Sequence, residues 1–386
     1  MGTAFLKLGL TSFGGPIAHL GYFRREFVDK RAWLGETQFT HLLALCQFLP
    51  GPASSQLGFS LGLVRAGWAG GLAAFLGFTL PSAILMFAFA AFLPVLAGPA
   101  GDVAIHGLKL VALVVVAQAV LGMSRQLCPD APRATIAAIA ASVILVSGKA
   151  WMQLVVIALG LAAGIVFCRK VQPLAGEQLE LRYGAALGAA ALAVFAALLV
   201  GLPLLAHTEG GLLAVADGFY RAGALVFGGG HVVLPLLRET VVASGWVSPD
   251  DFLAGYGAAQ AVPGPMFTLS AYLGARLPAD LGGAVGASIA LAAIFLPGFL
   301  LLAGILPLWT RFARHERAVQ AIAGVNAAVV GILAAALYDP VWTSAVQGPL
   351  DVAIAAVGFT LSVAWRVSAL VVVLWCVVAA MFAALA

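Results

Sequence analysis

The chain reads SFGGPIAHLGYFRRE at residues 12–26 and VFGGGHVVLPLLRET at residues 226–240. After the first stretch comes RAWLGETQFTHLLALCQFLPGP at residues 31–52, and after the second SGWVSPDDFLAGYGAAQAVPGP at residues 244–265. Both copies contain Phe-Gly-Gly, then a tryptophan, then a glutamine and a Pro-Gly-Pro, at nearly constant spacing. Motifs that recur in the same order and at nearly constant spacing indicate an internal duplication.

The chain as a whole is too apolar for a water-soluble protein. Of its 386 residues, 62% are apolar and 9% are charged, whereas soluble domains carry about 25% charged residues. Several uncharged runs reach the ~20 residues that a membrane-spanning helix needs. These runs cover 67–100, 103–124, 184–206, 281–310 and 318–338.

The spans and the repeat together predict the domain organisation. Each half reads as two interrupted segments followed by four spans, with 184–206 as an extra helix between the halves. We therefore expect a first repeat at 1–170, a linker with the extra helix at 171–210, and a second repeat at 211–386. The four spans of the first half and the extra helix together cross the membrane an odd number of times. The second repeat therefore enters the membrane from the opposite side to the first. The predicted fold is an all-α polytopic membrane protein with two inverted-topology repeats, a common plan for secondary transporters.

The interrupted segments 5–27, 37–64, 216–243 and 250–277 can either span the membrane as kinked helices or re-enter it as hairpins. Arms such as 5–13 and 17–28 are only about 14–18 Å long as helices and cannot cross a core of about 30 Å alone. If all four segments are hairpins, 15 Lys/Arg lie on the N-terminal side and 4 on the other; if they span, the split is 12 to 7, with the membrane-embedded Lys109 left out of both counts. Because basic loops concentrate in the cytoplasm, hairpins are favoured, with the N-terminus cytoplasmic and the C-terminus periplasmic.

Re-entrant breaks predict an anion site. Irregular backbone at membrane depth is tolerated where it is buried in protein or lines a wet cavity, and helix N-termini that begin there attract anions. Pro-Gly-Pro can also merely kink a helix, and Ser or Thr can merely cap one. The candidate substrate-binding residues near the breaks are Ser12, Gly14, Gly15, Gln47, Gly51, Ser54, Ser55, Gly229, Gly230, His231, Gln260, Gly264 and Thr268.

A few ionisable residues add to this prediction. Lys109 lies inside the span that begins at Val103, and its counterpart in the repeat is Asn326; both join the candidate site, although a lysine there can also snorkel to the interface. Arg24 and Arg25 form either a vestibule that draws in anions or ordinary solvated loop charges. Three histidines are candidates for coupling protons or for structural roles: His19, His41 and His106.

Other chemistries lack their motifs. The four cysteines are scattered without metal-ligand spacing, and no Walker motif or supported Ser/His/Asp arrangement occurs. We expect no metal, no cofactor and no enzymatic activity. The net charge of +4 lies in short loops and does not indicate a nucleic-acid partner. No cleavable signal is expected, because Lys7 interrupts the first apolar run.

The motifs resemble those of the chromate ion transporter family, in its long-chain, two-domain form. The resemblance is carried by FLKLGLTSFGGPIAHLGYFRREFV at 5–28, QFLPGP at 47–52, FGGGHVVLP at 227–235 and QAVPGP at 260–265. It implies a bacterial inner-membrane exporter of chromate, energised by the proton motive force and acting as a homodimer among membrane lipids. A carrier of sulfate or another oxyanion, and an anion channel, stay open as alternatives.

Overall fold

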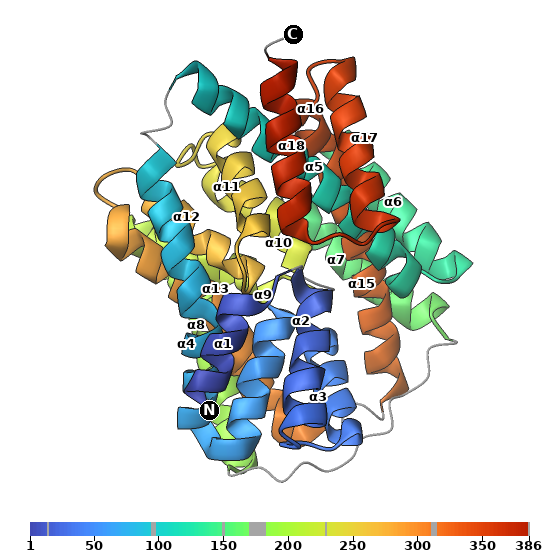
Figure 1. Cartoon of the computed structure of the whole chain (residues 1–386). Coiled ribbons are helices and arrows are strands. Elements are labelled where there is room, and N and C mark those ends of the chain that lie inside the picture. The colour runs from blue at the N-terminus through green and yellow to red at the C-terminus, as the bar shows by residue number, and fades with distance from the viewer. Residues whose placement is uncertain are drawn as a thin grey trace. The chain divides into compact units, whose positions relative to one another are not determined.

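A computed structural model describes residues 1–13, 15–93, 98–148, 151–169, 183–227, 230–309 and 315–384. Every regular element in these ranges is a helix (Figure 1). Five helices are long and apolar enough to cross a membrane: Ala53–Phe92, Gly101–Leu127, Ala185–Glu209, Gly283–Leu308 and Glu316–Ala345. They coincide with the five uncharged runs, so the prediction of an all-α polytopic membrane protein is confirmed.

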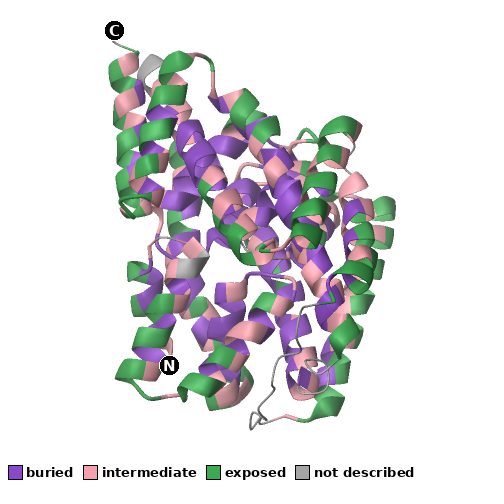
Figure 2. Cartoon of the chain, turned by 90° about the vertical axis from the view of Figure 1, so that its right-hand side faces the viewer, coloured by how far each residue is buried: buried purple, intermediate pink, exposed green. Residues whose placement is uncertain are grey.

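Exposed apolar side chains fit this class. Large residues such as Ile84, Val200 and Leu204 are about two-thirds exposed, and exposed positions lie along the outer faces of the helices (Figure 2). Contiguous apolar surface of this kind marks an interaction surface rather than a water-facing one. These helix faces are therefore suited to contact lipid.

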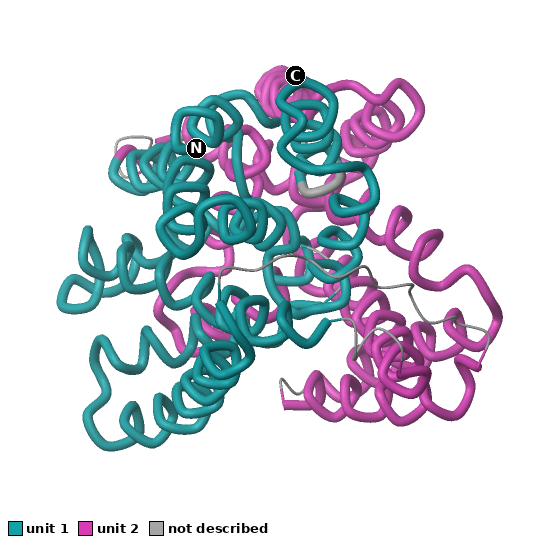
Figure 3. Tube along the Cα trace, turned by 90° about the horizontal axis from the view of Figure 1, so that it is seen from below, with its two compact units in different colours: residues 1–91, 174–233, 262–314 teal, residues 92–173, 234–261, 315–386 magenta. Residues whose placement is uncertain are grey.

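The chain divides into two compact units (Figure 3). Unit 1 consists of residues 1–91, 174–233 and 262–314; unit 2 consists of residues 92–173, 234–261 and 315–386. Each unit combines segments of both sequence halves, so neither corresponds to a single predicted repeat. The division into repeats at 1–170 and 211–386 stays a prediction.

Unit 1 begins with a helical hairpin. The ring of Phe5 on the first helix lies 5.8 Å from the ring of Phe23 and 4.7 Å from that of Phe27. A continuous helix would separate residues 5 and 23 by about 27 Å at 1.5 Å per residue. The chain therefore turns back after Ser12, and the segment 5–27 is not one kinked helix.

A second reversal lies within α4. Ala66 and Gly67 leave the helical conformation, and Gly67 has φ 64° and ψ −155°. The arms 53–65 and 68–92 then pack so closely that Gly62 has no room for a Cβ beside the Gly70 carbonyl. The other half of the sequence repeats this contact, with Gly274 against the Gly286 carbonyl. Such close backbone approach is typical of glycine-rich membrane helices.

In unit 1, α13 contacts α8, α9 and α12. The elements are α1 (Gly2–Thr11), α2 (Gly15–Arg24), η1 (Arg25–Lys30), α3 (Glu36–Phe48), α4 (Ala53–Phe92), α8 (Ala185–Glu209), α9 (Gly211–Ala224), η3 (Gly230–Val232), η4 (Met266–Thr268), α12 (Leu269–Ala275), α13 (Gly283–Ile305) and η5 (Leu306–Leu308).

Unit 2 is organised around α5 and α15. Helix α5 contacts α11, α17 and α18, and α15 contacts α6 and α7. The elements are α5 (Pro99–Leu127), α6 (Ala131–Ser147), α7 (Met152–Phe167), α10 (Val233–Val241), α11 (Pro249–Ala261), α15 (Glu316–Ala336), η6 (Leu337–Trp342), α16 (Thr343–Ala345), α17 (Pro349–Val363) and α18 (Ala369–Ala383).

Candidate functional site

The breaks of the two sequence halves meet in pairs within unit 1. The amide of Gly51, in the first Pro-Gly-Pro, donates a hydrogen bond to the carbonyl of Val226 at 2.7 Å. The amide of Gly264, in the second Pro-Gly-Pro, donates to the carbonyl of Ser12 at 2.9 Å. Val226 and Ser12 each directly precede a Phe-Gly-Gly. Each Pro-Gly-Pro is thus bonded to the glycine-rich break of the other half.

Both central glycines are required by this geometry. Gly51 has φ 123° and Gly264 has φ 109°, a backbone region that side chains disfavour. A Cβ on Gly51 would lie 3.0 Å from the Cα of Gly298, and one on Gly264 would lie 2.7 Å from the Oγ of Ser82. Ser82 directly follows the motif FTLP at 78–81, and Gly298 directly follows the matching motif IFLP at 294–297 in the other half. These contacts therefore also correspond between the halves.

Several buried polar atoms near the breaks have no hydrogen-bond partner among the described residues. They include the hydroxyls of Ser12, Ser55 and Thr79, on side chains that are almost fully buried. Buried polar groups nearly always have a partner, and each exception requires an explanation. Since the breaks contain no charged residue, these hydroxyls and the break backbone are candidate hydrogen-bond donors of a neutral site.

Two side chains hold the breaks in place. The Nε2 of His19 lies 3.1 Å from the carbonyl of Ser12. The amide nitrogen of Gln56 donates to the carbonyls of Pro50 at 2.9 Å and Gly298 at 3.0 Å. These bonds satisfy carbonyls that the interrupted helices leave without a helical partner, so His19 and Gln56 stabilise the irregular backbone.

Helices begin where the sequence predicts. In the first half, α2 begins at Gly15 and α4 at Ala53, directly after the two breaks. In the second half, the short 3-10 turns η3 and η4 begin at Gly230 and Met266. Amide groups at such beginnings lack intrahelical partners and are available to an anion.

The remaining predicted residues of unit 1 differ in their surroundings. Ser54 is buried, and a Cβ on Gly15 would lie 4.0 Å from the Nε2 of His231. The hydroxyl of Thr268 donates to the carbonyl of Pro265 at 2.8 Å, which is a local helix-end bond. Gln47 is exposed. Gly14 and Gly229 lie outside the described residues.

Three predicted residues belong to unit 2. Lys109 is 7% exposed, and its Nζ lies 2.6 Å from the Oδ1 of Asp250. Gln260 is buried and donates to the carbonyl of Tyr256 at 3.4 Å. The side-chain oxygen of Asn326 is buried without a partner among the described residues.

The predicted vestibule residues are solvent-facing. Arg24 bonds to Glu36 at 2.9 Å and to Asp29 at 3.3 Å, and about half of its side chain is exposed. Arg25 is exposed as well. Exposed pairs of this kind contribute little to stability. The vestibule role of Arg24 and Arg25 stays a prediction.

The sequence interpretation left three residues out of the candidate site. Thr79 and Ser82 lie inside a continuous apolar span, and only the repeated FTLP and IFLP motifs point to them. Asp217 on α9 is 5% exposed, pairs with Arg221 at 2.7 Å and leaves its Oδ1 without a partner among the described residues. Because Asp217 is a carboxylate within the interrupted segment 216–243, the sequence alone could have marked it as a functional candidate.

The comparison with known protein families decides the membership of the chain. The chromate transporter family model matches residues 1–165 and 213–382. The chain belongs to the chromate transporter family. The unmatched stretch between these ranges contains α8, the predicted extra helix.

Curated relatives agree with this membership over most of the chain. The chain is 29% identical to a chromate transport protein of Pseudomonas aeruginosa, over 94% of this chain and 86% of the relative. It is 30% identical to a probable chromate transport protein of Synechococcus elongatus, over 86% of this chain and 82% of the relative. No solved structure matches the chain. Members of the family are transport proteins, so the predictions of a membrane transporter and not an enzyme are confirmed.

Proposed function

We propose that the protein is a secondary active transporter that exports chromate from the cytoplasm across the bacterial inner membrane, energised by the proton motive force. Chromate binds at the breaks of unit 1, and the reciprocal bonds Gly51–Val226 and Gly264–Ser12 are the observation that carries this proposal. They bring the matching breaks of both halves into one compact unit, as a shared site at a repeat interface requires. The protein works as a homodimer among membrane lipids.

The chemistry of the breaks suits a tetrahedral dianion. Hydroxyls and backbone amides donate hydrogen bonds to its oxygens, while the absence of a fixed cation in the break sequences avoids holding the ion too tightly for release. Conduction and transport both require binding that is favourable but reversible. Ser12, Ser55 and Thr79 supply the donors.

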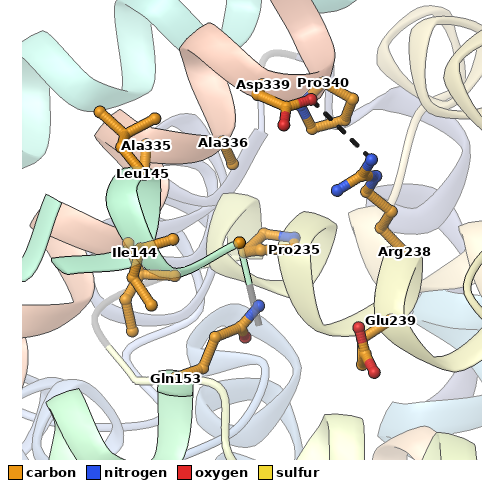
Figure 4. Close-up of a pocket in the computed structure, with 12 residues that line it drawn as sticks. Ile144, Leu145, Gln153, Pro235, Arg238, Glu239, Ala335, Ala336, Asp339 and Pro340 are labelled. Atoms are coloured by element: carbon orange, nitrogen blue, oxygen red, sulfur yellow. Dashed lines mark ion pairs between the residues drawn. The ribbon is translucent and has the colours of Figure 1, made fainter. Parts of the chain in front are cut away.

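Two ion pairs support the hairpin topology in the second half. Arg238 lies 3.9 Å from Asp339 (Figure 4), beside a cavity of about 110 Å³, and Lys109 lies 2.6 Å from Asp250. If the interrupted segments spanned the membrane, the two residues of each ion pair would lie toward opposite faces of the membrane. In the hairpin arrangement Arg238, Asp339 and Asp250 all fall on the periplasmic face.

Transport assays test the substrate. Inverted membrane vesicles that contain the protein are expected to take up radiolabelled chromate in a saturable way, faster than sulfate at equal concentration. Equal handling of the two ions would contradict chromate specificity. Flux that fails to saturate and ignores a pH gradient would favour an anion channel.

Single cysteines at positions 25 and 238 test the topology. In intact cells, an impermeant thiol reagent is expected to label Arg238→Cys and not Arg25→Cys. The hairpin model places position 238 outside the cell and position 25 in the cytoplasm. Permeabilised cells should expose both. Labelling of Arg25→Cys from outside would contradict the hairpin model.

Removal of the unpartnered hydroxyls tests the site. Thr79→Val, Ser12→Ala and Ser55→Ala are each expected to raise the KM for chromate, since a hydrogen bond to a charged group contributes about 1.5–3 kcal/mol, or roughly tenfold to a hundredfold. Thr360→Val is the matched control, because Thr360 is exposed and bonds only within α17, to the carbonyl of Ala356 at 2.9 Å. An unchanged KM in all three variants would remove the hydroxyls from the site.

A further inference from the structure

Unit 2 contains a cavity of about 750 Å³, with several ionisable residues in its lining, where α5, α11 and α17 begin. Its lining is acidic, with more carboxylates than cations, and of the predicted substrate-binding residues it includes only Lys109. A surface of this sign attracts protons and cations rather than chromate. The ionisable residues in the lining are Asp102, His106, Lys109, Asp250, Asp251 and Asp351.

A histidine–aspartate pair joins two helices at this cavity. The Nε2 of His106 on α5 lies 2.8 Å from the Oδ1 of Asp351 on α17. The other oxygen of Asp351 accepts hydrogen bonds from the backbone amides of Gln347 at 2.8 Å and Gly348 at 3.2 Å. The carboxylate is thus held from three directions, and its position in the first turn of α17 adds the favourable helix dipole.

The pair fixes which nitrogen of His106 is free. An ionised carboxylate only accepts hydrogen bonds, so Nε2 carries the hydrogen that it shares with Asp351. In the neutral ring Nδ1 then carries a lone pair. This Nδ1 is buried and has no hydrogen-bond partner among the described residues. It is an unused proton acceptor at the edge of an acidic cavity.

We propose that His106, held by Asp351, binds the proton that drives transport. This inference rests on the proposed function, which requires a coupling ion but assigns no residue to it. A hydronium ion in the cavity, supplied from the periplasm, gives up a proton: its O–H bond breaks as the N–H bond forms at Nδ1. The N–H bond breaks again when the proton passes to water on the cytoplasmic side as chromate moves outward.

A proton fits this site better than a metal ion does. No group of three or more His, Cys, Asp or Glu side chains converges to hold a metal among the residues that the structure describes. Asp250 is already paired with Lys109 at 2.6 Å. Imidazole, by contrast, gains and loses a proton between about pH 5 and 8.

Protonation also provides a means of coupling. It would place an N–H at a buried position that offers no acceptor in the present arrangement, and a buried donor without a partner destabilises the conformation that contains it. The proton therefore favours an arrangement of α5 in which Nδ1 gains a partner. Because α5 contacts α11, α17 and α18, such a rearrangement changes the packing throughout unit 2.

Other titratable groups surround His106 and shape its response. On α5 itself, Asp102 lies one turn before His106 and Lys109 one turn after it. The helices and turns packed against α5 contribute Asp250, Asp251 and Tyr256 on α11, Asp351 on α17, Cys376 on α18, and Tyr338 and Asp339 on η6. Helix α15 carries Glu316 and Arg317 in its first turn, and α16 carries no titratable residue.

Proteoliposomes that contain the purified full chain test the inference. With the lumen one pH unit more acidic than the outside and the membrane potential held at zero by an ionophore, antiport sustains about a tenfold accumulation of radiolabelled chromate for each coupled proton. His106→Gln and Asp351→Asn are expected to abolish this accumulation, while exchange of internal for external chromate, which moves no net proton, continues. Asp280→Asn is the control, because Asp280 is an exposed carboxylate on the loop between α12 and α13.

The outcomes separate the inference from the proposed function. Absence of chromate exchange by the wild type would contradict the proposed function itself. Wild-type accumulation in both variants would overturn the assignment of the proton to His106. If both variants lose exchange as well as accumulation, the assignment is also overturned, since the pair would then serve folding or substrate binding rather than coupling.

Discussion

Gly264→Ala is expected to reduce chromate transport by at least about a hundredfold. The new methyl group would lie 2.7 Å from the Oγ of Ser82 and 3.3 Å from the carbonyl of Phe78, so the Pro-Gly-Pro backbone must shift. The hydrogen bond from the Gly264 amide to the Ser12 carbonyl is then lost, and with it the contact between the breaks. Such a displacement of binding groups by about 1 Å can lower a rate about a hundredfold.

Two controls separate the contact from general strain. Gly148→Ala introduces a side chain at φ 58°, where nothing lies within 4 Å of the new Cβ, and it should cost only about 1–2 kcal/mol of stability. In the other half of the sequence, glycine occupies the position of Ser82, as Gly298. Gly264→Ala combined with Ser82→Gly is therefore expected to recover part of the transport. Full activity of Gly264→Ala alone would show that the two breaks need not touch.

The sequence predicted the elements of the site but not their pairing. The spacing of Phe-Gly-Gly and Pro-Gly-Pro located the breaks, because glycine and proline act on the local backbone. The bonds that join Gly51 to Val226 and Gly264 to Ser12 connect opposite halves of the chain. No local rule specifies such contacts, which form only when the helices pack.

The sequence also could not predict which of the matching side chains are exposed to solvent. Gln47 and Gln260 occupy matching positions, yet the first is exposed and the second buried. Helix α3 buries Phe39, Leu42 and Leu45, and Gln47 lies off this stripe. On α11, all residues from 252 to 260 are buried, because the helix is enclosed within unit 2. Matching sequence positions therefore do not imply matching environments.

Lys109→Ala is expected to abolish chromate export while the protein remains folded. The lysine side chain is 9% exposed, whereas that of its partner Asp250 is 65% exposed. Loss of the lysine leaves a carboxylate that water can solvate, so thermal stability should change little. Loss of the carboxylate, as in Asp250→Ala, leaves a buried cation without a partner. Breaking a buried pair costs roughly 3–5 kcal/mol, and the exposure of Asp250 reduces this to about 1–3 kcal/mol.

The double variant Lys109→Ala/Asp250→Ala decides what the lysine does. If Lys109 serves only its ion pair, removal of both charges should restore chromate resistance, because neither partner is left alone. If the positive charge of Lys109 is needed during the transport cycle, the double variant should stay inactive, and Lys109→Arg should keep part of the export because it keeps the charge. We expect the second result, since a cation inside a membrane-spanning helix is costly and therefore marks a functional position by default. Wild-type resistance in cells that express Lys109→Ala would assign the residue to the ion pair alone.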